Sequence, residues 1–485
     1  MRAHNTSHYR IDFGFDADHN WAYIQRLTES WDLPDPADGW SFGHPPFFYY
    51  AGAVVARAMD GAEKRDIVIA VRRASSAIGL LAIAGVVFCV MRLAPGDGRR
   101  HFLAAGLLLF LPMHIYISAM LGEEILASSL SSLAIVGVVL QLLHPPAFPR
   151  ALWAAVGLGL VAGLSFLTKL SGVLAMAAAC LTWLIAGWRR NAPAQGFACA
   201  VAFGAVASLV GGWPYAHNLV EHGYLYPHDL EVHAAMHTMP PGERSVSDYL
   251  RLPLATFTDP QVLHPDLIHS VWGTTYTTIW YDGHRVVLPR TARPISRLGT
   301  GMLLLGLVPT LAFGVGLWRG ARRAWAEPGG VDTLLVLLCG ATLLGYVFFT
   351  WKNPWYATLK GSYLLGMMLP FAVYTSEVLS SWTRAGGVRA GLVWFSLAAL
   401  ATLCVVVFTF QLVFLKLEGP GFKWRKQYPP KPGSAMIEQI PQPAAGAREA
   451  QTQQFAQRAV EQVELDDAHA AGDPRSRAPA ALVRP

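Results

Sequence analysis

The sequence predicts an all-α polytopic membrane protein with a bundle of about ten transmembrane helices. Hydrophobic residues make up 53% of the 485-residue chain and charged residues only 14%, whereas soluble domains carry about 25% charged residues. The charges gather in short segments between long apolar runs. Runs of about 18 or more apolar residues are long enough to cross the hydrocarbon core of a bilayer, which is roughly 30 Å thick.

These runs divide the chain into five parts. Residues 1–72 form an acidic N-terminal segment with juxtamembrane helices, predicted to be external, and 214–298 form a long external loop. Residues 73–213 hold the first six spans, 299–414 hold the last four, and 415–485 form a polar tail whose composition favours disorder. The ten predicted spans are 73–93, 101–119, 124–143, 151–168, 172–188, 195–213, 299–318, 331–350, 362–378 and 391–414.

Alternating crossings place the connecting segments on two faces of the membrane. One face has only short loops, and these carry eleven arginines: Arg92, Arg99, Arg100, Arg150, Arg189, Arg190, Arg319, Arg322, Arg323, Arg384 and Arg389. The short loops of the other face carry only Lys169, Lys352 and Lys360. This asymmetry predicts that the arginine-rich face is cytoplasmic, in an inner (plasma) membrane. Cations flanking the first and last spans argue the other way, and an anionic ligand on the second face would explain them.

Composition also excludes several classes of function. The formal net charge is +6, but the basic residues sit mostly in loops between apolar runs. Membrane lipids and anionic substrates are therefore expected partners, and nucleic acid is not. No P-loop or dinucleotide-binding glycine motif occurs, which argues against an ATP-driven transporter. The five cysteines lie inside apolar runs without metal-ligand spacing, so we expect small buried side chains.

The N-terminal segment concentrates polar residues that could carry chemistry. Asp16 and Asp18 lie beside His19, a grouping suited to a general base or to binding a cation. A solvated loop in which one aspartate caps a short helix is the structural alternative.

Further candidates stand at the ends of predicted spans. Glu123 and Glu124 open the third span and Lys169 follows the fourth. The acids could simply complement the helix dipole, and the lysine could be a membrane-surface anchor. Trp272 belongs to an aromatic stretch that could lie at the membrane interface or stack on a sugar. Alternation places these residues and Asp16 on one face, and this convergence favours an active site.

The N-terminal segment also carries a resemblance. The order Asp16-Ala-Asp18-His19, then Leu33-Pro34, Gly39-Trp40 and His44-Pro-Pro-Phe-Phe-Tyr-Tyr50 resembles the first external loop of GT-C glycosyltransferases. These are polytopic enzymes that use polyprenyl-phosphate-linked sugars, and they include protein O-mannosyltransferases and the lipid A aminoarabinose transferase. In that family, an acidic residue of this loop acts as catalytic base or binds a metal.

Later segments resemble the same family in the same order. They are Gly122-Glu123-Glu124, Leu167-Thr168-Lys169 with Gly172, Trp213-Pro214-Tyr215-Ala216-His217-Asn218, and Ser270-Val271-Trp272-Gly273. His217 stands where the family usually has arginine. Family members also begin with a span ahead of the acidic loop. Either a first transmembrane helix is encoded upstream of Met1, which we favour, or the N-terminal segment is held only by packing.

The resemblance implies a glycosyltransferase that moves a sugar from a polyprenyl-phosphate donor to an acceptor hydroxyl on the external face. Asp16, or less favourably Asp18, would be the general base, and Glu124 would assist. Lys169 would be the first of the cations that neutralise the leaving phosphate. Whether Mg²⁺ or Mn²⁺ takes part stays open, with Asp16, Asp18 and Glu124 as the ligands. The substrate-binding candidates are His19, His44, Glu123, Lys169, His217, Asn218, Trp272, Lys352 and Lys360.

The acceptor could be a lipid, a glycan or a protein. The main alternative is a transporter or flippase of a lipid-linked glycan, which would also need many spans. Transporters often show internal repeats and charges in mid-span, and neither is found here. The third hypothesis is a structural subunit of an envelope complex. It predicts that substitution of the acidic residues leaves the protein's function unchanged.

Overall fold

The fold is described from a computed structural model, for residues 1–227, 230–284, 293–384 and 386–410, without the side chains of 293–296 and 410. All of them belong to a compact unit, Met1–Lys416. A second unit, Leu417–Pro485, lies outside the described residues, and so does the predicted tail at 415–485.

The described residues form helices and no strand, apart from one isolated bridge between Pro241 and Trp355. The N-terminal segment contains α1 (Arg2–His8), α2 (Ala17–Glu29) and α3 (Phe47–Ala58). The first group of longer helices is α4 (Lys64–Leu93), α5 (Gly98–Leu109), α6 (Pro112–Ile117), α7 (Glu124–Leu143), α8 (Phe148–Thr168), α9 (Gly172–Arg189) and α10 (Pro193–Gly211).

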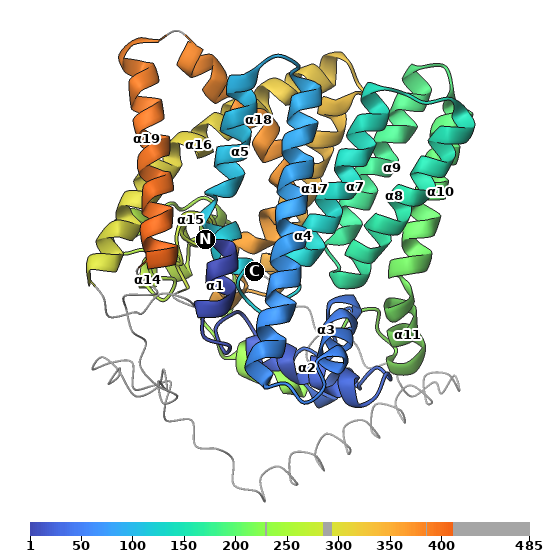
Figure 1. The fold of residues 1–485 in the computed structure, drawn as a ribbon, viewed down its shortest axis with the longest axis vertical. Coiled ribbons are helices and arrows are strands. Elements are labelled where there is room, and N and C mark those ends of the chain that lie inside the picture. The colour runs from blue at the N-terminus through green and yellow to red at the C-terminus, as the bar shows by residue number, and fades with distance from the viewer. Residues whose placement is uncertain (228–229, 285–292, 385, 411–485) are drawn as a thin grey trace, which may run out of the picture. The chain divides into compact units, whose positions relative to one another are not determined.

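The remaining described residues are also mostly helical (Figure 1). The predicted long loop is folded into short helices: α11 (Trp213–His222), α12 (Ala234–His237), α13 (Ala255–Thr258), α14 (Pro265–Ile268) and α15 (Val271–Trp280). The C-terminal group is α16 (Arg293–Ala326), α17 (Val331–Lys352), α18 (Met368–Arg384) with a preceding 3-10 turn (Gly361–Met367), and α19 (Gly387–Val405).

Among the described residues, nine helical segments are long and apolar enough to cross a membrane. Their outer surfaces are apolar as well: the side chains of Leu209, Leu344 and Phe395 are 78%, 72% and 69% exposed. Exposed apolar surface repeated along so many helices suits lipid and not water. The prediction of an all-α polytopic membrane protein is therefore confirmed.

One predicted span is wrong as a continuous helix. The segment 101–119 is broken at Phe110 and Leu111, between α5 and α6. Pro112 occupies the first turn of α6, where its ring is tolerated, whereas in mid-helix it would clash with the preceding turn. The 12 residues of α5 cover roughly 18 Å at 1.5 Å per residue, well short of the hydrocarbon core. The first predicted span also begins earlier, because α4 starts at Lys64.

Small residues bring the membrane helices close together. A Cβ on Gly159 of α8 would lie 2.7 Å from the Phe203 carbonyl oxygen of α10, and one on Gly163 would lie 2.9 Å from the Ala207 carbonyl oxygen. Glycines four residues apart let two helix backbones approach closely in a membrane. The contact fixes α8, whose last residue precedes Lys169.

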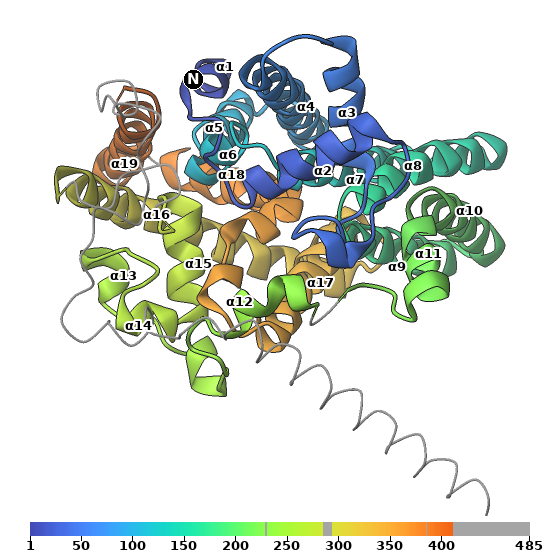
Figure 2. The same cartoon turned by 90° about the horizontal axis from the view of Figure 1, so that it is seen from below.

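The N-terminal helices cover one end of the bundle. Figure 2 looks at that end, where α2 and α3 lie on the same side of the bundle as α11 and α12. Tyr23 and Ile24 of α2, Tyr49 of α3 and Val68 of α4 belong to one buried apolar cluster. This packing holds the polar loops on either side of α2 against the ends of the membrane helices.

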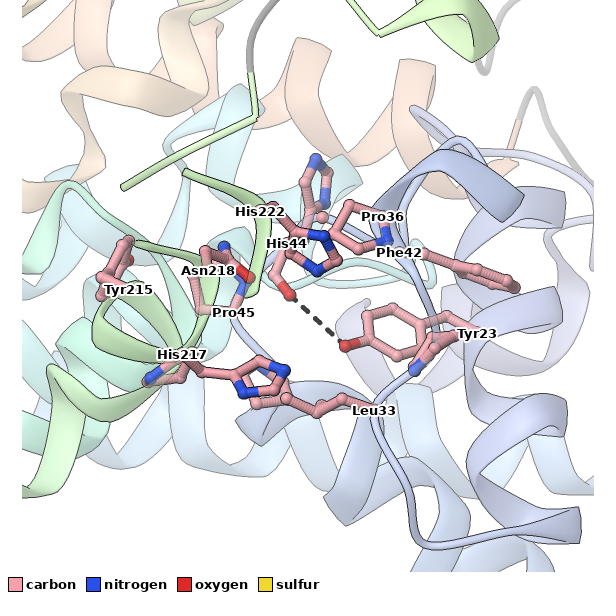
Figure 3. Close-up of a pocket in the computed structure, with 14 residues that line it drawn as sticks. Tyr23, Leu33, Pro36, Phe42, His44, Pro45, Tyr215, His217, Asn218 and His222 are labelled. Atoms are coloured by element: carbon pink, nitrogen blue, oxygen red, sulfur yellow. Dashed lines mark hydrogen bonds between the residues drawn. The ribbon is translucent and has the colours of Figure 1, made fainter. Parts of the chain in front are cut away.

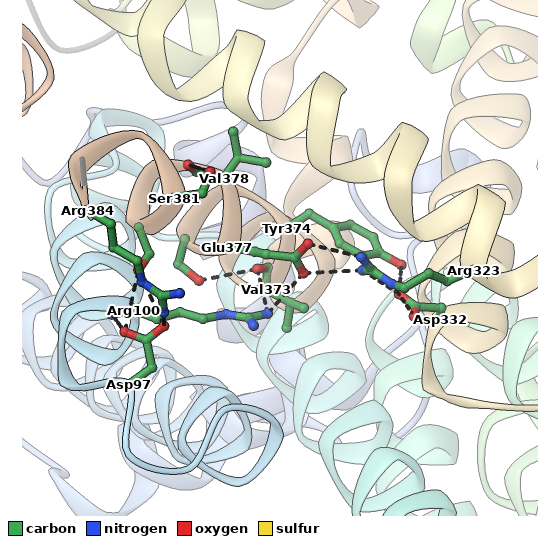
Figure 4. Close-up of polar contacts among 12 residues, drawn as sticks. Asp97, Arg100, Arg323, Asp332, Val373, Tyr374, Glu377, Val378, Ser381 and Arg384 are labelled. Atoms are coloured by element: carbon green, nitrogen blue, oxygen red, sulfur yellow. Dashed lines mark hydrogen bonds and ion pairs between the residues drawn. The ribbon is translucent and has the colours of Figure 1, made fainter. Parts of the chain in front are cut away.

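The opposite end is held by charges instead (Figure 4). Glu377 of α18 accepts from Arg323 of α16 at 3.0 Å, and its other carboxylate oxygen lies 3.4 Å from Arg100 of α5. Arg323 also pairs with Asp332 of α17 at 2.7 Å. Three of the predicted loop arginines (Arg100, Arg323 and Arg384) thus tie helix ends together.

Candidate functional site

A buried ion cluster joins the start of α7 to the end of α8. Glu123 precedes α7 as its N-cap, and Lys169 follows α8 as its C-cap. The Lys169 ammonium donates to Glu123 Oε1 at 2.6 Å and lies 3.5 Å from Glu124 Oε1. A carboxylate at a helix N-terminus and an ammonium at a C-terminus each complement the local helix dipole. Both charges are therefore stabilised by their own helices as well as by each other.

Polar contacts within the membrane hold these two helices in register. The hydroxyls of Ser131 on α7 and Ser165 on α8 are 2.7 Å apart, and Ser165 donates to the Ala127 carbonyl at 2.8 Å. In a bilayer, such interhelical hydrogen bonds replace contacts that water would otherwise make. They lie one to two turns from the ion cluster, so they help fix the distance between Glu123 and Lys169.

Electrostatics keeps this pair ionised. Burial disfavours the Glu123 carboxylate, but the charge and the hydrogen bond of the Lys169 ammonium outweigh burial, and the pKa of Glu123 falls to about 2. Burial likewise disfavours the Lys169 ammonium, and the two glutamates outweigh it, so the pKa of Lys169 rises well above its ordinary value. Lys169 therefore stays cationic, but two carboxylates already compensate its charge.

Asp16 lies in the turn that leads into α2. Its backbone adopts the left-handed conformation, with φ 57°, which aspartate tolerates better than most residues. Trp40 Nε1–H donates to Asp16 Oδ1 at 3.1 Å, and Lys360 Nζ lies 3.9 Å from Oδ2. The Asp16 side chain remains 34% exposed, so one face of the carboxylate is open to a ligand.

Lys360 is the second cation of the site. Its ammonium sits 4.1 Å from the centre of the Phe15 ring, and its side chain is only 11% exposed. It interacts electrostatically with Asp16 and Glu124. Unlike Lys169, it has no carboxylate within 3.5 Å among the described residues, so it is the cation better able to meet an added negative charge.

Arg72 fixes the backbone that leads to Asp16. It lies on α4, its side chain is completely buried, and its guanidinium donates to four carbonyls, those of Tyr9, Arg10, Ile11 and Phe13, at 2.9–3.2 Å. A guanidinium presents five donors in a planar fork, which suits several carbonyls of one tight turn. The geometry makes Arg72 a positioning residue for the Asp16 loop.

A second polar network lies between α2 and α3. Ser41 and Tyr49 both donate to Asn20 Oδ1 at 2.9 Å, and Asn20 Nδ2 donates to the Leu121 carbonyl at 2.9 Å. His44 Nδ1 lies 3.0 Å from the Tyr49 hydroxyl. His44 lines a narrow cleft together with Tyr23, Pro36 and residues of α11 (Figure 3).

An aromatic column connects Trp272 to the ion cluster. Trp272 packs against Tyr346 with ring centres 6.0 Å apart, and Tyr346 lies 6.2 Å from Tyr363. Lys169 Nζ sits 5.2 Å from the centre of the Tyr363 ring. Trp272 is thus two aromatic rings away from Lys169 and does not contact the ammonium directly.

The structure separates the predicted site residues into groups. Asp16, Glu123, Glu124, Lys169 and Lys360 come together through the pairs above. His44, His217 and Asn218 line the neighbouring cleft. His19 stacks on Trp40 at 5.3 Å at the edge of the site. Asp18 is 68% exposed and faces Lys64 at 3.7 Å, while Lys352 is an exposed residue at the end of α17.

Several residues of the site were not predicted from the sequence. Arg72, Asn20 and Tyr363 belong to apolar or ordinary helical stretches, and no motif distinguishes them. Tyr49 lies in the stretch His44–Tyr50 but was not predicted as a site residue. Arg72 carries the one usable signal, because it is a cation directly before the predicted span 73–93, and the structure places it inside α4. Such a residue is costly without partners and marks a site or a clamp.

The predicted metal ligands do not converge. Asp16 faces Lys360, Asp18 faces Lys64, and Glu124 faces Lys169. Within the described part of the chain, no three His, Cys, Asp or Glu side chains are placed to hold an ion together. Asp16, Asp18 and Glu124 in this arrangement therefore do not fit a shared Mg²⁺ or Mn²⁺.

The chain has only distant similarity to the known proteins that it matches. No family model matches the chain. A segment of 67 residues, 14% of this chain, is 34% identical to part of the fluoride-specific ion channel FluC 2 of Lactobacillus johnsonii. The matched part covers 56% of that channel. This segment is too small a share of the chain to assign a family.

Solved structures that this chain resembles include those of two proteins. One is the Archaeoglobus fulgidus oligosaccharyltransferase in complex with Zn and sulfate, at 16% identity and a TM-score of 0.48, covering 82% of this chain and 49% of that one. Another structure of the Archaeoglobus fulgidus protein, AglB in complex with an inhibitory peptide and a dolichol-phosphate, is 14% identical, with a TM-score of 0.44. The match covers 83% of this chain and 51% of that one.

The other is ArnT from Cupriavidus metallidurans bound to undecaprenyl phosphate, at 16% identity and a TM-score of 0.37. The match covers 78% of this chain and 75% of that one. This chain spans about half the length of the archaeal oligosaccharyltransferase. All three TM-scores lie below 0.5.

Proposed function

We propose that the protein is a membrane glycosyltransferase of the GT-C type. It would move a sugar from a polyprenyl-phosphate-type donor to an acceptor hydroxyl at the membrane face that carries α2 and α3. The observation that carries this proposal is the pairing of the partly open Asp16 carboxylate with the Lys360 ammonium, 3.9 Å away. A proton acceptor and a phosphate-binding cation are the two groups that such a transfer requires.

The transfer balances in one displacement. The acceptor oxygen forms a bond to the anomeric carbon of the sugar, and its proton passes to Asp16. The bond between that carbon and the donor phosphate oxygen breaks, and the electron pair leaves with the lipid phosphate. A single displacement inverts the anomeric centre.

Two lysines could neutralise the departing phosphate. Lys169 was the first choice from the sequence, but Glu123 and Glu124 lie 2.6 and 3.5 Å from its ammonium. Lys360 has one carboxylate at 3.9 Å, and it loses that partner's charge when Asp16 takes a proton. The geometry therefore favours Lys360 for the phosphate, with Lys169 and Glu123 as a preorganised support.

The arrangement of charges favours an external site. The other end of the bundle holds the arginine-rich loops, which are typical of a cytoplasmic face. We therefore place the site on the external face of an inner (plasma) membrane, where a polyprenyl-linked sugar would be delivered through the bilayer.

The test measures the product that any donor sugar would release. The purified protein in phosphatidylcholine nanodiscs is mixed with a panel of undecaprenyl-phosphate sugars and an extract of envelope glycans and lipids. The release of free undecaprenyl phosphate is followed by chromatography. We expect release with wild type and a loss of at least about a hundredfold with Asp16→Asn, since a general base contributes about 10² to 10⁴ in rate.

A transporter predicts the opposite result. In sealed vesicles it would move the intact lipid-linked sugar from one leaflet to the other without freeing undecaprenyl phosphate. Movement without cleavage, or release unaffected by Asp16→Asn, contradicts the proposal.

A further inference from the structure

The cleft beside the ion cluster has the lining of a site for a neutral, polar ligand. Its walls include prolines and aromatic rings, and no carboxylate, lysine or arginine takes part among the described residues. The hydrogen-bonding side chains of the lining include those of Tyr23, His44, Tyr215, His217, Asn218 and His222. Apolar walls with a few placed hydrogen-bonding groups are typical of small-molecule sites.

The hydrogen bonds of Asn20 and Tyr49 determine which nitrogen of His44 carries the proton. The Leu121 carbonyl can only accept, so the amide nitrogen of Asn20 must face it at 2.9 Å and the amide oxygen must face the hydroxyls. Tyr49 has one hydroxyl proton, and it goes to Asn20 Oδ1 at 2.9 Å. The contact between His44 Nδ1 and the Tyr49 oxygen, at 3.0 Å, therefore needs a proton on Nδ1.

This leaves Nε2 of the neutral ring with a lone pair. No protein group within the described residues bonds to His44 Nε2, and this atom is not among the fully buried ones. The ring lines the cleft between Pro36 and Asn218, as Figure 3 shows. The lone pair is thus available to a ligand in the cleft.

We propose that the cleft binds a neutral saccharide of the acceptor and that His44 accepts a hydrogen bond from one of its hydroxyls through Nε2. Asn20, Ser41 and Tyr49 are the positioning residues that hold this tautomer. The inference rests on the proposed function and specifies its acceptor: a neutral glycan, with the donor phosphate left to the lysines. His44 then determines specificity, since an imidazole lone pair repels a phosphate or carboxylate.

The surroundings keep the ring neutral. Burial lowers the pKa of His44; Lys169 and His233 reinforce the effect, while Glu123 and Asp16 oppose it. His217 and His222 are the other titratable groups apart from tyrosines on the cleft wall. Saccharide binding should hold between pH 9 and 7 and weaken at acidic pH, when a proton occupies Nε2.

Saturation-transfer NMR with neutral methyl glycosides of glucose, mannose, galactose and N-acetylglucosamine tests the inference. The full chain is held in phosphatidylcholine nanodiscs, because maltoside detergents carry the same chemistry as the ligand. His44→Asn retains an amide donor at the position of Nδ1, so the contact with Tyr49 survives while the Nε2 lone pair is lost. Tyr49→Phe removes the acceptor that fixes the tautomer, and His144→Asn, at the opposite end, is the matched control.

We expect transfer to at least one glycoside with wild type and with His144→Asn. The affinity should fall about fivefold to tenfold with His44→Asn, as for one lost hydrogen bond of roughly 1 kcal/mol, and less with Tyr49→Phe. Inorganic phosphate should not displace the glycoside at pH 8. Failure of every glycoside to bind, equal affinity with His44→Asn, or displacement by phosphate each overturns the inference.

The two proposals fail separately. Release of undecaprenyl phosphate by wild type without glycoside binding would leave the glycosyltransferase standing and remove the saccharide cleft. Glycoside binding that His44→Asn weakens, without any such release, would keep the cleft and remove the proposed reaction.

Discussion

Lys360 Nζ lies 3.9 Å from Asp16 Oδ2, although the two residues come from opposite ends of the described chain. Asp18, only two residues after Asp16, points instead to Lys64 at the protein surface. This divergence turns two equivalent-looking carboxylates into a site residue and a surface residue. It also provides a matched pair for mutagenesis.

Asp16→Asn should abolish most of the transfer activity, while Asp18→Asn should leave it within about twofold of wild type. The amide removes the proton acceptor but keeps the shape of the side chain and its contact with Trp40. We therefore expect kcat to fall by a factor of about 10² or more. The two variants are compared by release of undecaprenyl phosphate, with melting temperature as the folding control. Equal activities of the two variants would remove Asp16 from its role.

Lys169→Met should destabilise the protein strongly. It leaves Glu123 and Glu124, which are 5% and 9% exposed, without their shared cation, and breaking such a pair costs about 3–5 kcal/mol. The double variant Lys169→Met with Glu123→Gln should recover part of this loss, because one stranded charge is removed. Thermal unfolding in nanodiscs measures both, and an additive double variant would contradict the pairing.

Stability should fall in acid through the same pair. The folded-state pKa of Glu123 is about 2 and its ordinary value is 4.5, so the folded state holds the carboxylate ionised more firmly than the unfolded state does. This contribution is fully present above pH 4.5 and is lost as pH falls from about 4.5 to 2. Melting curves of wild type and Glu123→Gln should differ in slope in that window and run parallel above pH 5.

Arg72→Met should impair catalysis more than Arg73→Met does. Arg72 is buried and binds four carbonyls that lead to Asp16, whereas Arg73 makes an exposed bond to Ser7 Oγ at 2.9 Å. Loosening a catalytic group by about 1 Å can cost roughly a hundredfold in rate. A positioning role predicts a lower kcat with little change in KM, and a purely structural role predicts a lower melting temperature with unchanged kcat per folded molecule.

Orientation can be tested with cysteine labelling, since four of the five native cysteines are buried and the fifth, Cys180, lies within the membrane helix α9. Ala37→Cys lies on an exposed residue of the N-terminal segment, and Ala326→Cys is exposed at the opposite end of the bundle. A membrane-impermeant maleimide applied to intact cells should label the first and not the second. The reverse pattern would place the site inside the cell.

Part of this protein could be predicted from hydropathy because the bilayer imposes a simple rule. Each crossing segment must satisfy its own backbone hydrogen bonds and be about 20 apolar residues long. That rule predicted α7 and α8, and hence that Glu123, Glu124 and Lys169 stand at helix ends. It failed at 101–119, where Pro112 permits a break that the average hydropathy of the run conceals.

The site itself was only partly predictable, because its geometry depends on contacts between distant segments. The sequence by itself determined the all-α membrane architecture and the residue types gathered near one end of the bundle. The tertiary structure alone decided that Asp16 and not Asp18 meets Lys360, and that Arg72 holds the Asp16 turn. It likewise decided that Asn20 and Tyr49 orient His44. Hydropathy acts segment by segment, whereas these pairings arise only when folding brings remote polar groups into a low-dielectric environment where each must find a partner.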